Sequence, residues 1–470
     1  MEKKRAYFIG IAGMGMSAVA ILLKEQGWRV SGSDTEMYPP ATTQLKRHKI
    51  SLKTSYRPSN IPKDAELVVI GMNAKLRREN NTEVKAAYES GIRIASFPEI
   101  LGNLVEKRKP IVVVGSYGKS TITALIAWCL SQSGIDAGWF VGAAPEGMEP
   151  SHLGTHPMFV LEGDEYPTSR TDARPKFAHY HAHDALITAA SHDHVNIYTT
   201  QEDFLKPFRS FVAGIPASGI LLFCGDEPHA ASLARNAKAH VVSYGMTSVS
   251  EWHPKNISYE DTTTFDLAKG AANIATLSTT LIGGHNIQNI VGASAMVLEK
   301  KLITPEQLAI AIKDFKGLTR RLDKKTARSS VPAYEGFGSS REKLRAAMSA
   351  LATRYPEKRL VVVFEPHTFS WRNKGMLHWF DTAFEGAALV VLYKPAEQGA
   401  ATHEQSTQEE MLARLAAAGV DVHPAADPEE AMRALASEVK QNDVVLLSSS
   451  GGMDGLIERV PTWLEEKFGA

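Results

Sequence analysis

The sequence contains few cysteines and no excess of charge of either sign. Its two cysteines, Cys129 and Cys224, are far apart and lie in apolar segments. Neither a disulfide framework nor a cysteine metal cluster is therefore expected, and a reducing cytoplasm is the expected compartment. Lys plus Arg and Asp plus Glu number 52 each, so no basic surplus is available to hold a nucleic acid backbone. Any nucleotide should therefore be a small ligand at a local site.

Long uninterrupted apolar runs are missing as well. The stretch that ends at Leu23 follows a basic N-terminus, as a secretory signal would, but Gly10, Gly13 and Gly15 interrupt it. A strand, a tight turn and a helix explain this stretch better. No later segment is long and apolar enough to cross a membrane. We expect a protein with neither a membrane nor a nucleic acid as partner, acting as a monomer or a homodimer.

Short β-branched apolar runs alternate with helical patterns along the chain. Continuous apolar strands between helices imply parallel sheets that are covered on both faces, which is an α/β fold. A chain of 470 residues with 44% hydrophobic residues suits two to four such domains. The expected strands are Ala6–Ile11, Leu67–Ile70, Ile111–Val114, Phe159–Leu161, Ala185–Ile187, Leu360–Phe364, Ala388–Leu392 and Val444–Leu447.

Two segments mark candidate domain boundaries. Lys107–Pro110 is a charged link that ends in proline just before a new apolar run. At Phe315–Leu318 a helical stretch closes and a further α/β pattern begins. The sequence thus predicts three domains, spanning residues 1–107, 108–317 and 318–470.

The strongest local motif is a glycine-containing loop between an apolar run and a helical pattern. After Val112–Val114 the chain reads Gly-Ser-Tyr-Gly-Lys-Ser-Thr and continues into a predicted helix at Ile122–Gln132. Such a loop turns its N–H groups and the helix N-terminus toward an anion. Its glycine spacing is shorter than in the usual Walker A motif, and an ordinary loop is the alternative. The expected nucleotide-binding residues are Gly115, Ser116, Gly118, Lys119, Ser120 and Thr121.

A second glycine-rich turn lies at the N-terminus. Gly10–Ser17 joins an apolar run to a helical pattern, and Ser31–Asp34 ends the next apolar run. A dinucleotide-binding domain places a ribose-binding acid at about this spacing, so an NAD-dependent enzyme is one interpretation. The additional phosphate loop at Gly115 favours another one, in which a UDP-sugar is joined to a second molecule at the expense of ATP.

In their order along the chain, these motifs resemble those of the Mur ligase family. The resemblance covers nearly the whole sequence and rests on Gly10–Met16, Gly115–Thr121, Glu162–Glu165, Asp193–His194 and His285–Asn289. It implies three domains: a Rossmann-like N-terminal domain for UDP-N-acetylmuramate, a central P-loop ATPase, and a Rossmann-like C-terminal domain that presents the amine.

The resemblance also implies roles for individual residues, with ATP and Mg²⁺ as cofactors. Two of these residues also have an alternative to a contact with ATP, since Asn286 could cap a helix and Arg321 could be a solvated surface charge. The implied catalytic residues are Lys119, Glu162 and His194, and the implied Mg²⁺ ligands are Ser120, Glu162 and His194. Further ATP contacts are implied for Asn286, Asn289, Arg321 and Glu335, and sugar-nucleotide contacts for Gly13, Gly15, Met16, Ser17, Asp34 and Asn73.

Two stretches look more like the murein peptide ligases of this family than like its L-alanine-adding members. They are Tyr38–Leu45 and Asp164–Tyr180. The resemblance implies that the lactyl carboxylate of the sugar nucleotide attacks the γ-phosphate of ATP. The amine of a recycled peptide, L-Ala-γ-D-Glu-meso-diaminopimelate, then displaces phosphate from the acyl phosphate. Addition of L-alanine is the alternative.

The sequence departs from the family pattern at several positions. Ser116 and Tyr117 stand between the loop glycines, Thr188 and Ser191 precede Asp193, and Asn196 replaces a common Asp. In the third domain the family motif contains two histidines and two acids, whereas here it reads Glu-Gly-Phe-Gly-Ser-Ser-Arg at Glu335–Arg341. These departures are compatible with two interpretations. One is an active ligase with altered contacts, and the other is a homologue that binds muramyl compounds without catalysis.

Overall fold

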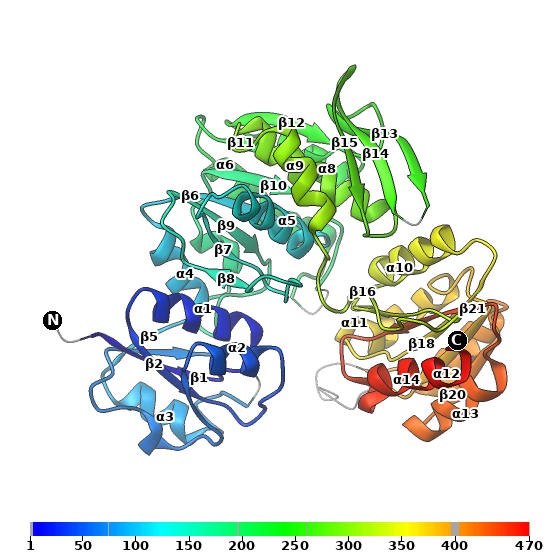
Figure 1. Cartoon of the computed structure of the whole chain (residues 1–470). Helices are drawn as coiled ribbons and strands as arrows, with labels where there is room; N and C mark the ends of the chain where they lie inside the picture. The colour runs from blue at the N-terminus through cyan, green and yellow to red at the C-terminus, as the bar shows by residue number, and fades with distance from the viewer. Residues whose placement is uncertain (1–2, 74, 195–196, 261, 396–403, 470) are drawn as a thin grey trace.

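The chain forms three β-sheets, which follow one another along the sequence (Figure 1). The computed structural model describes residues 3–73, 75–194, 197–260, 262–395 and 404–469, so Asn196 lies outside the described residues. The sheets fall within residues 5–95, 109–279 and 321–448. The divisions expected at residues 107 and 317 lie between these sheets and stay predictions.

The N-terminal sheet is parallel, with the strand order β3-β2-β1-β4-β5. From β1 the chain first adds strands on one side, β2 and β3, and then on the other side, β4 and β5. In open α/β sheets the carboxyl ends of the two strands at this switch point, here β1 and β4, border a binding crevice. Gly10 follows β1 with φ of +83°. The strands are β1 (Arg5–Ile9), β2 (Arg29–Ser33), β3 (Ser51–Lys53), β4 (Leu67–Ile70) and β5 (Arg93–Ala95), and the helices are α1 (Met14–Glu25), α2 (Ala41–Arg47), α3 (Thr82–Glu89) and α4 (Phe97–Val105).

The central sheet has ten strands, in the order β15-β14-β13-β12-β11-β10-β6-β9-β7-β8. Its parallel part contains β6 next to β9 and β10, so the loops after these three strands open on the same edge. The strands are β6 (Lys109–Val114), β7 (Gly138–Phe140), β8 (Ser151–His152), β9 (Met158–Gly163), β10 (Asp184–Ile187), β11 (Ile220–Cys224), β12 (His240–Tyr244), β13 (Trp252–Tyr259), β14 (Thr263–Lys269) and β15 (Ala272–Thr279). The helices are α5 (Lys119–Gln132), α6 (Gln201–Gly214), α7 (Pro228–Ala234), α8 (Gly284–Glu299) and α9 (Pro305–Asp314).

The expectation of parallel sheets is wrong for two parts of the central sheet, namely β8, which pairs antiparallel with β7, and the strands β13, β14 and β15. These strands pair antiparallel, with Phe265 opposite Leu277. Along β14 the side chains of Thr263, Phe265 and Leu267 are buried, and the residues between them are partly exposed. Alternation of this kind is typical of an antiparallel sheet with one solvated face.

The C-terminal sheet has the order β16-β17-β21-β18-β19-β20 and is parallel except for β16, which pairs antiparallel with β17. All eight strands expected from the sequence are present, with ends shifted by at most two residues. The strands are β16 (Arg321–Lys324), β17 (Ala333–Gly336), β18 (Arg359–Phe364), β19 (Leu389–Tyr393), β20 (Val422–Ala425) and β21 (Asp443–Ser448). The helices are α10 (Arg341–Arg354), α11 (Phe369–Arg372), α12 (Gln408–Ala417), α13 (Pro428–Glu438) and α14 (Leu456–Phe468).

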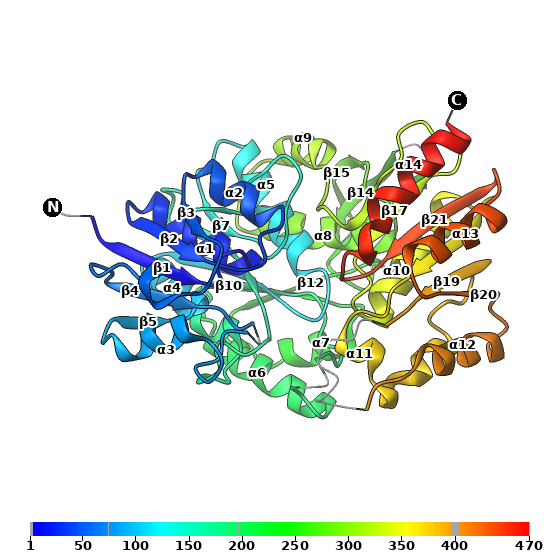
Figure 2. The same cartoon turned by 90° about the horizontal axis from the view of Figure 1, so that it is seen from below.

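The N-terminal and C-terminal domains lie on opposite sides of the molecule and both adjoin the central domain (Figures 1 and 2). Helix α10 of the C-terminal domain packs against α8 of the central domain. Their contact is close, because a Cβ atom on Gly283 would come within 2.4 Å of the Cβ of Ala350. In the described part of the chain, no helix combines the length and the apolarity needed to cross a membrane.

Candidate functional site

The loop between β6 and α5 has the backbone form of a phosphate-binding turn. Gly115 and Gly118 have φ values of +136° and +83°, which residues with a side chain rarely adopt. A Cβ atom on Gly115 would also lie 2.2 Å from Oγ1 of Thr188. Helix α5 begins directly after Gly118, at Lys119, so its unpaired N–H groups face the loop. This geometry suits an anionic ligand.

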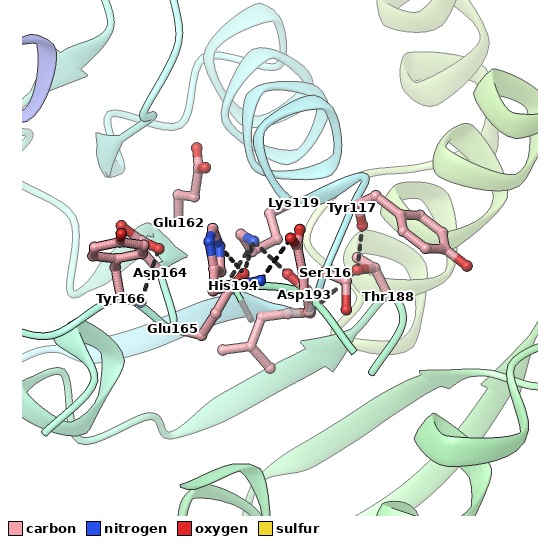
Figure 3. Close-up of polar contacts among 12 residues, drawn as sticks. Ser116, Tyr117, Lys119, Glu162, Asp164, Glu165, Tyr166, Thr188, Asp193 and His194 are labelled. Carbon is pink, nitrogen blue, oxygen red and sulfur yellow. Dashed lines mark hydrogen bonds and ion pairs between the residues drawn. The ribbon is translucent and has the colours of Figure 1, made fainter. Parts of the chain in front are cut away.

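Lys119 lies in a network of charged groups below this loop (Figure 3). Its Nζ atom donates to Oε2 of Glu165 at 2.8 Å and also to the carbonyl oxygen of Gly115. The other oxygen of Glu165 lies 3.1 Å from Nε2 of His194. Burial lowers the pKa of both Lys119 and His194, but nearby carboxylates, Glu165 among them, more than offset this and hold each pKa above its ordinary value.

Ser120, in the first turn of α5, and Glu162, near the end of β9, form a separate pair. The hydroxyl of Ser120 donates to Oε1 of Glu162 at 2.8 Å, and Oε2 of Glu162 accepts from the N–H of Gly142 at 2.7 Å. Arg321, at the start of the C-terminal sheet, donates to the Ser120 hydroxyl at 3.1 Å. A hydroxyl and a carboxylate are the oxygen ligands that Mg²⁺ prefers.

A second group with metal-ligating atoms contains Asp164, Glu165 and His194, whose ligand atoms lie within 4.8 Å of one another. Two ammonium groups already neutralise its carboxylates, because Lys176 pairs with Asp164 and Lys119 with Glu165. Of the two oxygen-rich arrangements, Ser120 with Glu162 therefore fits a divalent cation better. The three ligands expected from the sequence are divided between the two arrangements, since His194 contacts Glu165.

A cleft of about 260 Å³ lies between the N-terminus of α5, helix α8 and the C-terminal domain. Asn286 and Asn289 line it from α8, and the amide nitrogen of Asn286 donates to the carbonyl oxygen of Ile282 at 2.9 Å. His285 also lines the cleft, and burial lowers its pKa to about 4, so it is neutral at pH 7. Amides and a neutral imidazole provide donors and acceptors for a polar ring.

A larger cleft of about 470 Å³ lies between the N-terminal and central domains. Gly13, Asp34 and Asn73 line it on one side, and Ser120 and Glu162 reach it from the other. Both clefts are bordered by Arg321 and Phe337. Ligands held in the two clefts would therefore meet beside Arg321.

Comparison with known proteins agrees with this architecture. Three family models match in succession: the Mur ligase family catalytic domain at residues 5–109, the Mur ligase middle domain at 113–297, and the Mur ligase glutamate ligase domain at 320–451. A UDP-N-acetylmuramate–L-alanine ligase of Desulforapulum autotrophicum is 30% identical over 397 residues, which cover 83% of this chain and 84% of that protein. The chain belongs to the Mur ligase family.

Other members of the Mur ligase family are also similar to this chain in sequence or in structure. A UDP-N-acetylmuramate–L-alanyl-γ-D-glutamyl-meso-2,6-diaminoheptanedioate ligase of Haemophilus influenzae is 29% identical, covering 78% of this chain and 80% of the relative. The crystal structure of a murein peptide ligase from Psychrobacter arcticus shares the fold, with a TM-score of 0.73, 22% identity, and coverage of 99% of this chain and 100% of that one. Mur ligases are ATP-dependent enzymes that form amide bonds, and the family binds UDP-N-acetylmuramate and amino acid or peptide substrates.

Several residues expected at the Mur ligase site do not line either cleft. Gly15, Met16 and Ser17 lie within α1, where Gly15 faces the ring of Phe97 and Ser17 is buried. Glu335 is 3% exposed and pairs with Arg320 at 2.7 Å and Lys325 at 2.8 Å. Their assignment to ligands stays a prediction.

Two further residues border the clefts without having been expected there, and a third joins two domains beside the larger cleft. Tyr38, 70% exposed, borders the larger cleft beside two prolines. Lys343 borders the smaller cleft from α10. Arg170 of the central domain donates to the carbonyl oxygens of Met72 and Asn73 and so joins the two domains at the larger cleft. The aromatic ring of Tyr38 next to two prolines is a signal that the sequence shows, whereas nothing local in the sequence marks Lys343 or Arg170.

Proposed function

We propose that this Mur ligase joins the carboxylate of UDP-N-acetylmuramate to the amine of the peptide L-Ala-γ-D-Glu-meso-diaminopimelate, using ATP and Mg²⁺. The observation that carries this proposal is that the two clefts meet at Arg321, beside Ser120 and Glu162. A nucleotide in one cleft and a carboxylate in the other would then be adjacent. Such alignment supplies much of the acceleration in phosphoryl transfer.

The residues fit a polyphosphate and a divalent cation on chemical grounds. Arg321 and the N-terminus of α5 present positive charge to the smaller cleft, and Lys119 lies in the adjacent phosphate loop. Ser120 and Glu162 offer oxygen ligands. A bound Mg²⁺ would neutralise charge that develops on the transferred phosphoryl group. We assign Lys119 to the phosphates, Arg321 to the transferred group, and Ser120 and Glu162 to the metal.

The choice of a peptide as the amine substrate rests on two kinds of support. Tyr38–Leu45 and Asp164–Tyr180 resemble the murein peptide ligases, and Tyr38 borders the larger cleft. A relative that matches 78% of this chain is named as a ligase for the same peptide. The second candidate is ligation of L-alanine, which is favoured by the name of the Desulforapulum autotrophicum relative.

An active enzyme is favoured over a homologue that only binds muramyl compounds. The motif Glu335–Arg341 lacks the two histidines of the family pattern. However, Lys119, Ser120, Glu162 and His194 are all present, and each is held by a polar contact close to the phosphate loop. A chain that had lost catalysis would have no reason to maintain four such groups together.

The experiment that tests this proposal is phosphate release combined with product mass determination. The protein receives ATP, Mg²⁺ and UDP-N-acetylmuramate with either the tripeptide or L-alanine, or without an amine. We expect release and a ligated product only with the tripeptide. Release with L-alanine and not with the tripeptide would establish the second candidate, and no release with any amine would leave a binding protein.

Matched variants of the central domain complete this experiment. Lys119→Ala is expected to abolish product formation, whereas Lys313→Ala, on the exposed side of α9, is expected to retain it. Turnover that survives in Lys119→Ala would contradict the assignment of the phosphate loop.

A further inference from the structure

Lys343 extends from the C-terminal domain toward the phosphate loop of the central domain. It occupies the first turn of α10, and its Nζ atom donates to the hydroxyl of Ser339 at 3.0 Å. The same atom lies 3.9 Å from Oδ2 of Asp193, which directly precedes His194 in the central domain. Its side chain is 25% exposed and borders the smaller cleft together with Tyr117 and Gly118.

Two cationic side chains border this part of the cleft, Arg321 and Lys343, and Lys119 lies in the adjacent phosphate loop, where it pairs with Glu165. Lys119 comes from α5, Arg321 from the junction between the domains, and Lys343 from α10. Burial lowers the pKa of Lys343; the charge of Asp193 raises it, and the like charges of Lys119 and Arg321 lower it further. Two like charges that border one partly desolvated cleft favour the binding of an anion between them.

The contacts of Lys343 within the protein do not account for its position. Ser339 is an uncharged partner only four residues away, and the separation of 3.9 Å from Asp193 is too long for a hydrogen bond. An ammonium group has three donors, the Ser339 hydroxyl accepts one of them, and the side chain borders the cleft. A structural lysine would be expected to pair fully with a carboxylate or to extend into solvent.

We propose that Lys343, in addition to Arg321, binds the terminal phosphate of ATP from the C-terminal domain. It lies two positions after the segment Glu335–Arg341, in which this chain lacks the two family imidazoles, and it supplies a cation from the same side of the cleft. The inference rests on the proposed function, since it requires ATP in this cleft. Because α10 belongs to the C-terminal domain, the contact also couples nucleotide binding to the position of that domain.

The test is equilibrium binding of ATP and ADP, measured by calorimetry without sugar nucleotide so that no turnover occurs. We expect Lys343→Met to weaken ATP binding about 10- to 100-fold, the range for loss of one charge-assisted hydrogen bond. ADP binding should weaken less than about threefold, because ADP lacks the contacted phosphate. Lys343→Arg should restore most of the ATP affinity, because it keeps the positive charge.

Arg345→Met is the matched control, since Arg345 lies on the same helix but contacts Thr382 and Glu385. It should leave both affinities unchanged. Equal loss of ATP and ADP affinity in Lys343→Met, or ATP affinity equal to that of the wild type, would overturn the inference. If the wild type binds ATP and Lys119→Ala abolishes binding, such a result refutes only the role of Lys343. If the wild type binds no ATP, the proposed function fails as well.

Discussion

The guanidinium group of Arg321 donates a hydrogen bond of 3.1 Å to the hydroxyl of Ser120, a residue 201 positions earlier in the chain. Ser120 belongs to the phosphate loop, whereas Arg321 begins the first strand of the C-terminal sheet. The backbone around Arg321 is unusual, because Arg320 and Leu322 have φ values of +65° and +55°. Such conformations cost about 1–3 kcal/mol each and persist at functional sites. The chain thus turns sharply where it brings Arg321 between the two clefts.

Replacement of Arg321 should therefore affect the chemical step. We expect Arg321→Met to lower kcat about 10²- to 10³-fold, the range for loss of one group that stabilises transition-state charge. Burial lowers the pKa of Arg321, but a guanidinium remains charged at any working pH. The measurement is phosphate release at saturating substrates, with exposed Arg328→Met as the control. An unchanged kcat would show that Arg321 only links the domains.

The metal assignment can be tested by titrating the activity with Mg²⁺. We expect Glu162→Gln to raise the Mg²⁺ concentration for half-maximal activity about 10-fold or more, since loss of a ligand charge weakens binding of a hard cation. Glu146→Gln, at an exposed position, should leave it unchanged. A shift in Glu165→Gln together with none in Glu162→Gln would instead place the metal at the group of Asp164, Glu165 and His194.

His285 should make stability depend on pH. Its pKa is about 4 in the folded protein and about 6.5 when unfolded, so the unfolded chain binds more protons between these values. The contribution of neutral His285 to the unfolding free energy is therefore present above pH 6.5 and decreases as the pH falls toward 4. When the pH is lowered from 7.5 to 5.0, the unfolding free energy of the wild type should fall by about 2 kcal/mol more than that of His285→Gln. Denaturant unfolding at both pH values measures this.

The control for that measurement is His240→Gln, because His240 is exposed on β12. Its unfolding free energy should change with pH as that of the wild type does. The same pH dependence in His285→Gln and in the wild type would show that His285 has no part in acid sensitivity.

Glu335 allows a distinction between a structural and a ligand-binding role. The family resemblance implied a contact with ATP, for which the ribose hydroxyls would be the donors, but the carboxylate of Glu335 is buried between Arg320 and Lys325. We expect Glu335→Gln to lower Tm by several degrees, since a charge-assisted hydrogen bond contributes about 1.5–3 kcal/mol and about 2–4 °C follows per kcal/mol in a domain of this size. ATP affinity should stay within about twofold. Weaker ATP binding at an unchanged Tm would support the ribose contact.

The sequence determined the features that depend on neighbouring residues. The run of valines, the two glycines and the following helix at Val112–Gln132 specify a strand, a turn and a helix N-terminus wherever they occur. Gly13 and Asp34, which the family resemblance implied as sugar-nucleotide contacts, border the larger cleft. Antiparallel strands β13–β15 were missed, although the alternation at Thr263–Leu267 is visible in the sequence.

Only the tertiary structure decided which distant side chains share a site. Glu335 was expected at the nucleotide but pairs with Arg320, whereas Lys343 borders the cleft without any local signal. The physical reason is that local backbone preference fixes an element but not the face on which another domain packs. Where α10 meets α8 depends on contacts such as Ala350 against Gly283, which only the folded chain brings together.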